Sequence, residues 1–295
     1  MDYVYHLGAH RTASTFLQEN LSNNLDTLRA QGIFYVNEEM PEALHKQRKT
    51  IRALCHPDRQ TPPADQLAQL NADITRQAEN TGARVVLISE QNRLGPAMHQ
   101  SLSWKIDNPG FYPQAASCLR YMTAGLPLDR TRILLYSRTP ETYLLSLYSE
   151  AIRSARINMD LSAFCRAVNF NAIDFQGLQQ RLQAVDPRLD IKMRSFERIK
   201  LGAESYLRTF LRDTGADPAG FTCHIKRMQQ QLDANQVEAL RQISMRGQSK
   251  RWRLVKRLRE QVLAYDPDPA YRLELPGWVR DSLTVTTQAR DSHVA

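Results

Sequence analysis

The sequence has few of the residues that mark fibrous, disulfide-rich or membrane-spanning proteins. Its 295 residues include only 12 glycines, 14 prolines and 4 cysteines, which excludes collagen-like, low-complexity and disulfide-scaffold proteins. The longest aliphatic runs, residues 85–88 and 133–135, are far shorter than the roughly 18 residues of a membrane-spanning helix. The N-terminus has an early acid and no apolar stretch of signal-peptide length. We therefore expect a soluble, cytoplasmic protein with no membrane span.

The cysteines give no sign of a metal or redox centre. Cys55, Cys118, Cys165 and Cys223 are far apart in the sequence and form no CxxC pair. A CxxC pair is typical of structural zinc sites and of redox dithiols. We expect four free thiols in a reducing compartment and no metal site.

Positive charge is concentrated in one segment. The chain has 39 Lys+Arg against 31 Asp+Glu, a net charge of +8. Residues 241–260 alone contain eight Lys/Arg and one acid, a net charge of +7 (8 − 1). Such a segment attracts phosphate, sulfate, nucleic acid or an anionic membrane surface, or it is only a solvated helix face. Both interpretations stay open.

Strand patterns alternate with helix patterns along the first two thirds of the chain. Short apolar runs predict strands at residues 3–7, 84–89, 132–137 and 189–195. Apolar periodicity predicts helices at residues 15–31, 65–79, 113–123, 141–157 and 206–214. This alternation favours a mostly parallel sheet with helices on both faces.

The last part of the chain has no strand pattern. Helices are expected at residues 232–246 and 250–265, and the last twenty residues are expected to be irregular. We predict a single three-layer α/β domain over residues 1–275, P-loop-like, with a helical and basic part over about 225–275. Residues 276–295 are predicted to form a C-terminal tail.

The first predicted strand leads into a turn and a helix that together suit an anion. Residues 8–15 read Gly-Ala-His-Arg-Thr-Ala-Ser-Thr. In such a turn the backbone N–H groups and the helix N-terminus point at an anion. Hydroxyls at Thr12, Ser14 and Thr15 add donors, and Ser14 or Thr15 is also expected to cap the helix. The donors exceed what capping requires, so the turn is a candidate phosphate site.

This turn differs from the ATP-binding loop G-x4-G-K-[ST]. Ala13 and Ser14 stand where that loop has glycine and lysine. The cation here is Arg11, at the bend of the turn, and arginine presents a planar fork of donors rather than a point charge. The pattern therefore argues against an ATPase.

The same residues resemble a known family. The pattern His6-x-Gly8-x-x-Arg11-Thr12-Ala13-Ser14-Thr15-x-Leu17-Gln18 is similar to the 5′-phosphosulfate loop of sulfotransferases that use 3′-phosphoadenosine 5′-phosphosulfate (PAPS). The bacterial branch of that family usually reads H-x-G-x-x-K-T-G-T-T-x-L-Q. The chain differs by Arg11 in place of the lysine and Ala13 in place of the glycine. The resemblance implies that Gly8 and residues 11–15 bind the 5′-phosphosulfate of PAPS.

A second motif follows the strand predicted at residues 132–137. Pro140 suits the first turn of a helix, which places Ser146 about two turns along. Ligands of parallel α/β sheets bind at the carboxyl ends of the strands, so we expect Arg138 and the first turn to face one crevice. Arg138, Pro140, Ser146 and Tyr148 resemble the R-x-P and S-x-Y pattern that holds the 3′-phosphate of PAPS in sulfotransferases.

The resemblance implies transfer of a sulfuryl group from PAPS to an acceptor hydroxyl, with the attacking and leaving oxygens in line and no metal. Arg11 and the helix N-terminus would stabilise the negative charge on the departing phosphate. His6 and His10 flank the turn and are expected to be structural or positioning residues.

The reaction also needs a general base opposite the leaving group. Glu90 directly follows the strand at residues 84–89 and is the first candidate, with a salt bridge or a helix cap as its alternative role. His45 is the second candidate, and Glu38 and Glu39 come next.

The acceptor is not fixed by the sequence. The helix expected at residues 250–265 has an apolar stripe that indicates core contact. If its basic side borders the acceptor site, through Arg251, Arg253 and Arg257, it suits an anionic acceptor such as an acidic or already sulfated glycan. Other small-molecule acceptors stay open, and so does the oligomeric state.

Two further functions stay open. One is an ATP-dependent phosphotransferase with a similar loop, and the other is a non-catalytic protein that binds nucleotide or nucleic acid. Trp252 is the one aromatic residue among the basic ones, which makes a nucleic acid partner unfavourable. Residues 195–198 are similar to a segment common in bacterial sulfotransferases, and residues 246–248 are a candidate cover for the adenosine.

Overall fold

The computed structural model describes residues 1–55, 63–98, 100, 110–154, 157–225, 231–246 and 252–292. The chain groups into two compact units. The first comprises Met1–Pro96, Tyr112–Arg138 and Phe175–Met228, and the second comprises Ala97–Phe111, Thr139–Asp174 and Gln229–Ala295. Each unit is described by itself, and a single domain over residues 1–275 stays a prediction.

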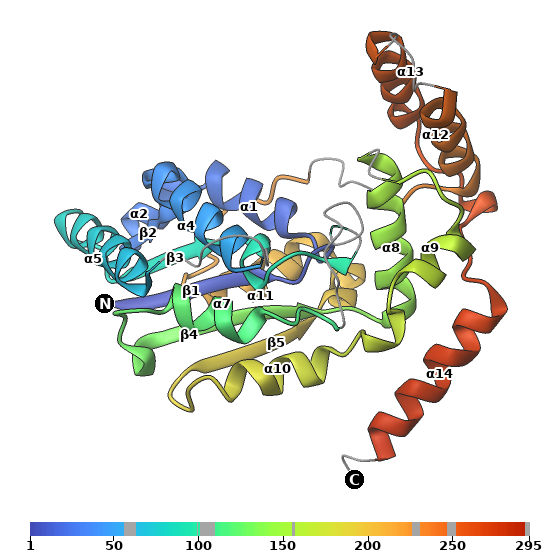
Figure 1. The fold of residues 1–295 in the computed structure, drawn as a ribbon. Helices are drawn as coiled ribbons and strands as arrows, with labels where there is room; N and C mark the ends of the chain where they lie inside the picture. Colours follow the sequence, from blue (N-terminus) through green and yellow to red (C-terminus); the bar gives the residue numbers. More distant parts are fainter. Residues whose placement is uncertain are drawn as a thin grey trace. The chain divides into compact units, whose positions relative to one another are not determined.

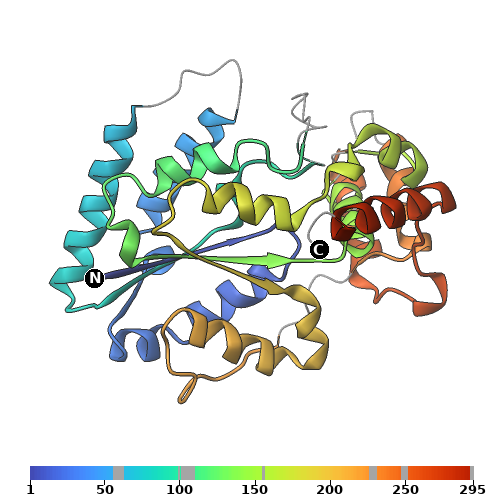
Figure 2. The same ribbon diagram turned by 90° about the horizontal axis from the view of Figure 1, so that it is seen from below.

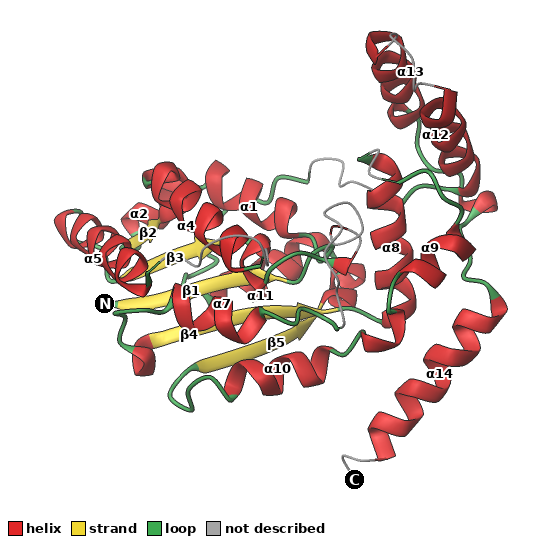
Figure 3. Ribbon diagram, viewed as in Figure 1, coloured by secondary structure: helices red, strands yellow, loops and turns green. Residues whose placement is uncertain are grey.

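The first unit contains a five-stranded, entirely parallel sheet with the order β2-β3-β1-β4-β5 (Figures 1 and 3). The strands are β1 (Asp2–Gly8), β2 (Ile33–Tyr35), β3 (Val85–Ser89), β4 (Thr131–Ser137) and β5 (Asp190–Ser195). The predicted α/β class and the four predicted strands are confirmed. The sequence analysis missed β2, because three residues are too few to show a strand period.

Side chains of β1 alternate between two helical layers, as successive residues of a strand must. The Tyr3 hydroxyl hydrogen-bonds Thr75 Oγ1 of α5 (Ala64–Asn80) at 2.8 Å. The Tyr5 hydroxyl donates to the Met122 carbonyl of α7 (Ala115–Met122) at 3.1 Å. His6 instead contacts the ring of Phe210 on α11 (Ala203–Asp213). The central strand is therefore covered on both faces, which explains its nearly continuous apolar sequence.

Two sets of helices form the layers in Figure 2. One layer contains α1 (Ser14–Asn23), α2 (Leu25–Ala30) and α11 (Ala203–Asp213). The other contains α5 (Ala64–Asn80), α7 (Ala115–Met122) and α10 (Phe175–Gln183). Along the chain, α3 (Val36–Glu39) and α4 (Pro41–Leu54) come between β2 and α5. The predicted three-layer arrangement is confirmed.

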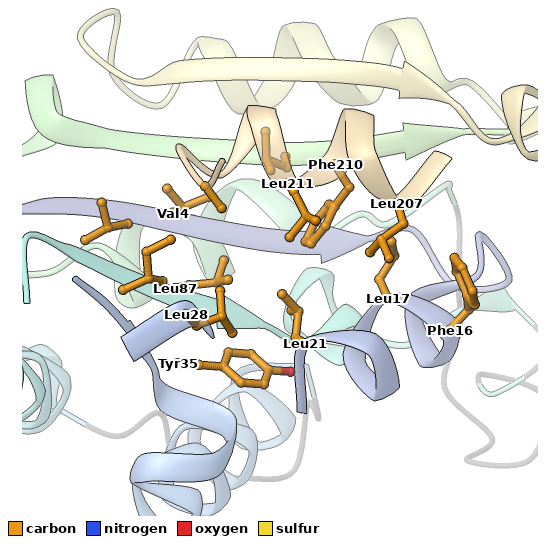
Figure 4. Close-up of a cluster of buried hydrophobic side chains, with 14 of the residues drawn as sticks. Val4, Phe16, Leu17, Leu21, Leu28, Tyr35, Leu87, Leu207, Phe210 and Leu211 are labelled. Atoms are coloured by element: carbon orange, nitrogen blue, oxygen red, sulfur yellow. The ribbon is translucent and has the colours of Figure 1, made fainter. Parts of the chain in front are cut away.

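The core between the sheet and the first layer is built from leucines and aromatic rings (Figure 4). Leu17 and Leu21 of α1 meet Leu207 and Phe210 of α11 over β1. All four are buried at 0 or 1% exposure, and burial of each such side chain contributes about 1.5–3 kcal/mol. This packing fixes the start of α1, and with it the turn that follows β1.

The single helix expected at residues 15–31 is wrong, because the helix is interrupted at Asn24. The Asn24 amide accepts from Thr222 N–H at 2.8 Å and donates to the Thr222 carbonyl at 2.9 Å. Asn20 binds the backbone of His224 in the same two-way manner. These side chains hold an extended segment against α1, a tertiary interaction that helix periodicity cannot reveal.

The second unit is helical, with α8 (Pro140–Arg153), α9 (Leu161–Ala167), α12 (Ala234–Arg246), α13 (Trp252–Ala264) and α14 (Gly277–Ser292). The prediction of an irregular C-terminal tail is therefore wrong. Among the side chains of α14 that the structure describes, residues 277–286, Val279 and Leu283 are the buried ones, one turn apart and at 0 and 2% exposure. So narrow an apolar stripe gives a weak sequence signal.

Short 3-10 turns complete the chain, among them η1 (Gln91–Leu94), η2 (Leu128–Arg130), η3 (Phe170–Ala172), η4 (Phe196–Leu201) and η5 (Pro269–Tyr271).

Buried His6 should make stability depend on pH. Burial lowers the pKa of His6 to about 3, from 6.5, so below pH 6.5 the unfolded chain binds a proton that the folded chain refuses. The contribution of His6 is complete above pH 6.5 and is lost as pH falls toward 3, at up to about 1.4 kcal/mol per pH unit. In urea titrations at several pH values, His6→Gln should flatten this slope. Equal slopes in wild type and His6→Gln would contradict the assignment.

Candidate functional site

The turn between β1 and α1 lies at the topological switch point of the sheet. From β1 the chain goes to β2 on one side of the sheet, whereas from β4 it goes to β5 on the other side. Adjacent strands whose connections diverge mark the point where ligands bind in open α/β sheets. The turn follows β1 and Arg138 follows β4, so both motifs found in the sequence reach this point.

The backbone of the turn suits an anion. Arg11 and Ala13 both adopt left-handed conformations, with φ of 64° and 59°, and alternating conformations of this kind aim successive N–H groups into one concavity. Ala13 is the N-cap of α1 and supplies no side-chain hydrogen bond. The expectation that Ser14 or Thr15 caps the helix is wrong, since both lie inside it. The first N–H groups of α1 therefore have no side-chain cap.

The three hydroxyls of the turn have different surroundings. Thr12 Oγ1 donates to the Ala9 carbonyl at 2.7 Å, so its proton stabilises the turn itself. Ser14 Oγ is buried and has no hydrogen-bond partner. Thr15 is exposed. Ser14 is thus the hydroxyl with an unmet hydrogen bond, and a buried polar group in that state costs about 1–3 kcal/mol.

Arg138 contacts the turn directly. Its Nη1 donates to the Arg11 carbonyl at 2.8 Å, which confirms that the two motifs lie together. The Arg138 guanidinium also lies over the ring of Phe196, 4.6 Å from its centroid. Stacking fixes the plane of the guanidinium, and the hydrogen bond fixes its rotation in that plane.

Phe196 belongs to a set of contacts that the sequence analysis missed. It is the first residue of η4, directly after β5, and its ring packs edge-on against Tyr206 of α11. The Tyr206 hydroxyl donates to the Thr12 carbonyl at 3.1 Å. The sequence marks residues 195–198 only by their similarity to a segment of bacterial sulfotransferases. The feature that could have indicated the role of Phe196 is its position, as an aromatic residue directly after the edge strand. These contacts link β5 and α11 to the turn.

Glu90 directly follows β3 and is buried at 2% exposure. Its carboxylate forms a short ion pair with Arg48 of α4. It also accepts from the Asn92 side chain at 2.7 Å and from Asn92 N–H at 3.2 Å, which caps η1. The carboxylate thus has both alternative roles, salt bridge and cap. Its role as the general base stays a prediction.

His10 joins the turn to the same segment. Both nitrogens of the His10 ring are hydrogen-bonded. Nδ1 lies 2.8 Å from the Tyr112 hydroxyl, and Nε2 lies 3.2 Å from Asn92 Oδ1. Because Asn92 Nδ2 donates to Glu90, Asn92 Oδ1 is the acceptor, so Nε2 carries the proton and Nδ1 accepts from Tyr112. His10 is therefore a positioning residue between the turn and Glu90.

Arg93 adds an unpaired positive charge beside this segment. It is fully buried, and none of its guanidinium nitrogens has a hydrogen-bond partner. Burial lowers its pKa to about 10. Since Arg48 of α4 already pairs with Glu90, the group formed by Arg48, Glu90 and Arg93 carries a net charge of +1 (2 − 1). This charge was not recognised in the sequence.

The other candidate bases lie on α3 and α4. His45 is exposed on α4. Glu38 accepts from Ser22 Oγ at 2.5 Å, and Glu39 pairs with Arg29 at 2.7 Å. None of these contacts involves the turn, and the role of these residues as bases stays a prediction.

Ser146 lies on α8 of the second unit and is buried, and its part in binding stays a prediction. Of the candidate adenosine cover, residues 247 and 248 lie outside the described residues. In the ranges that the structure describes, no helix is long and apolar enough to cross a membrane, and no group of three His, Cys, Asp or Glu residues could hold a metal ion. All four cysteines are free thiols.

Comparisons with known proteins show a resemblance of fold and no match of sequence. No family model matches the sequence, and no curated protein matches it. Among solved structures, the fold is similar to that of a sulfotransferase from Alicyclobacillus acidocaldarius, with 14% sequence identity and a TM-score of 0.47. The similarity covers 92% of this chain and 99% of that chain.

The turn requires a glycine at position 8 for two separable reasons. Gly8 has a φ of +85°, and a Cβ added there would lie 2.9 Å from Gln91 Cβ. Gly82 has a similar φ of +72° and no atom within 4 Å of an added Cβ. We expect Gly82→Ala to lower the free energy of unfolding by about 1 kcal/mol, and Gly8→Ala to lower it by about 1–3 kcal/mol more. Equal losses in urea titrations would mean that Gln91 does not constrain the turn.

Proposed function

We propose that the chain is a sulfotransferase that moves a sulfuryl group from PAPS to an acceptor hydroxyl. The observation that carries this proposal is the buried, unpartnered Ser14 hydroxyl at the uncapped N-terminus of α1. An anion bound there would receive hydrogen bonds from groups that otherwise have none. The motif around Ser14 resembles the 5′-phosphosulfate loop, which names the anion.

The residues present fit the 5′ end of such a nucleotide. Helix N-termini favour phosphate through their free N–H groups and their dipole. Ser14 adds a hydroxyl donor, and Arg11 adds a positive charge within the turn. Two hydrogen bonds stabilise the conformation of the turn. The Thr12 hydroxyl donates to the Ala9 carbonyl, and the Tyr206 hydroxyl donates to the Thr12 carbonyl. A site that is rigid before binding loses less free energy in ordering its ligand.

Arg138 is proposed to bind the 3′-phosphate. A guanidinium presents donors in one plane that match two oxygens of a phosphate. Phe196 and the Arg11 carbonyl already fix that plane. Ser146 of the second unit is proposed as a further ligand of the same phosphate. ATP has no 3′-phosphate, so this contact distinguishes PAPS from the nucleotide of the alternative phosphotransferase.

PAPS supplies an activated sulfuryl group whose leaving group is a phosphate. In the proposed reaction Arg11 and the α1 N-terminus stabilise the negative charge that develops on the leaving oxygen. Such stabilisation works best where donors are fixed in advance, as the backbone of this turn is. The proposal requires no metal ion, because the leaving group carries no triphosphate to neutralise.

The base remains part of the proposal. Glu90 is the first candidate and His45 the second. For Glu90 to take the proton of the acceptor, Arg48 must release one carboxylate oxygen, and Arg48 is half exposed at 49%. A base is effective when its oxygen reaches the acceptor hydroxyl within about 3 Å. An anionic acceptor able to pair with Arg48 would free Glu90 as it binds, which favours an acidic acceptor such as a glycan.

Nucleotide binding provides the direct test. We expect isothermal titration to show micromolar binding of the desulfo product, 3′-phosphoadenosine 5′-phosphate, and no comparable binding of ATP. Arg138→Ala should weaken binding of the 3′-phosphorylated nucleotide about 10- to 100-fold, since a charge-assisted hydrogen bond contributes about 1.5–3 kcal/mol. It should weaken binding of adenosine 5′-phosphate much less, because that ligand lacks the 3′-phosphate and loses only the support that Arg138 gives to the turn.

Two variants serve as controls for this titration. Arg76→Ala removes an exposed arginine of α5 that pairs only with Asp73 in the described contacts, and it should bind like wild type. Phe196→Leu keeps Arg138 but removes its stacking partner, and it should lower the preference for the 3′-phosphorylated nucleotide over adenosine 5′-phosphate. Failure of wild type to bind the 3′-phosphorylated nucleotide, or tighter binding of ATP, would refute the proposed function.

A further inference from the structure

The basic segment at residues 241–260 supplies none of the phosphate-binding residues proposed above, and its described part contains exposed apolar side chains. Of nine large apolar side chains exposed in the described residues, seven lie between residues 245 and 285. These are Met245, Leu254, Leu258, Tyr265, Tyr271, Trp278 and Val285. Clustered apolar exposure on a folded chain marks an interaction surface.

Helix α13 is held at a fixed rotation about its axis. Its Arg259 is buried and donates to the carbonyls of Leu240, Ile152 and Arg153 at 3.1, 2.6 and 3.1 Å. At the other end, the Gln236 amide donates to the Tyr265 carbonyl at 3.0 Å. Arg259, although it belongs to the basic segment, is therefore structural. The face of α13 opposite Arg259 cannot turn inward.

The outward part of α13 combines apolar and basic side chains. Leu254 and Leu258, one turn apart, are 48 and 39% exposed, and Tyr265 just beyond the helix is 73% exposed. Arg253 and Arg257, also one turn apart, are exposed and form a neighbouring stripe. Lys256 is exposed and pairs loosely with Glu260 at 3.8 Å. In Figure 1, α13 lies beside α12 as a helical hairpin.

We propose that α13 binds the surface of a membrane that contains anionic lipids. A helix with a leucine stripe beside Lys and Arg lies in the plane of such a surface, with its leucines among the acyl chains and its cations at the headgroups. Tyr265 suits the same boundary, where aromatic residues with a polar end are enriched. This inference does not depend on the proposed function.

The positive charge and the exposed leucines of α13 together favour a membrane over two other partners, a nucleic acid and a second copy of the chain. A nucleic acid would pair with the cations but leave the leucines in water. A second copy of the chain would bring Arg253, Lys256 and Arg257 against their own like charges, which is unfavourable. An anionic bilayer uses both stripes, because it is negatively charged at its surface and apolar just below.

The test is co-sedimentation of the full chain with vesicles of phosphatidylcholine, with and without phosphatidylserine. We expect binding to the anionic vesicles that weakens with added salt. Arg253→Gln with Arg257→Gln should lower the partition coefficient about 10-fold or more, since each basic residue contributes about five-fold near such a surface. Leu254→Gln with Leu258→Gln should lower it by a similar factor. Leu201→Gln, at a 76% exposed leucine of η4, should bind like wild type.

Several results would overturn the inference. These are no binding to anionic vesicles, equal binding to neutral vesicles, or a loss in the arginine variant with none in the leucine variant. The last result would indicate a purely electrostatic partner such as nucleic acid. Sedimentation velocity without vesicles tests whether a second copy of the chain binds this face instead. A dimer that the leucine variant abolishes would assign the face to that second copy. Circular dichroism of each variant confirms that it folds.

Discussion

The parallel pairing of β1 with β4 is the constraint on which the site depends. Because the chain leaves these two strands in opposite directions, the turn after β1 and the arginine after β4 must share one edge of the sheet. The hydrogen bond from Arg138 to the Arg11 carbonyl joins them. The register shift in β1 between His6 and Gly8 ends regular pairing just before the turn.

The neighbourhood of this edge is rigid and incompletely satisfied. Tyr206, Phe196 and the Thr12 hydroxyl fix the turn and Arg138 from the side of β5 and α11. Yet the Ser14 hydroxyl is buried without a partner, and so is the guanidinium of Arg93. Unmet buried polar groups are unfavourable, and a positively charged edge that leaves them unmet is suited to an anion. The geometry thus supports the proposed anion site, whereas the choice of PAPS as the anion rests on the resemblance of the motifs.

Much of this arrangement could be predicted from local sequence. Strands such as β3 are buried on both faces, so their apolar runs are unmistakable, and topology then places the residues that follow them. The ion pair of Glu90 with Arg48 could not be predicted, because Arg48 lies on a different element and no local sequence pattern links the two residues. Phe196 and Tyr206 act through tertiary contacts of the same kind. The interruption at Asn24 and the helix α14 depend on packing against distant segments, where periodicity is weak or misleading.

The most direct measurement of the central claim is the phosphorus NMR spectrum of bound 3′-phosphoadenosine 5′-phosphate, recorded on wild type and on Ser14→Ala. If the turn holds the 5′-phosphate, removing the Ser14 hydroxyl should shift the 5′ resonance and leave the 3′ resonance in place, because Arg138 is untouched. A spectrum in which neither resonance shifts, or in which only the 3′ resonance does, would contradict the assignment of the turn to the transferable end of the nucleotide.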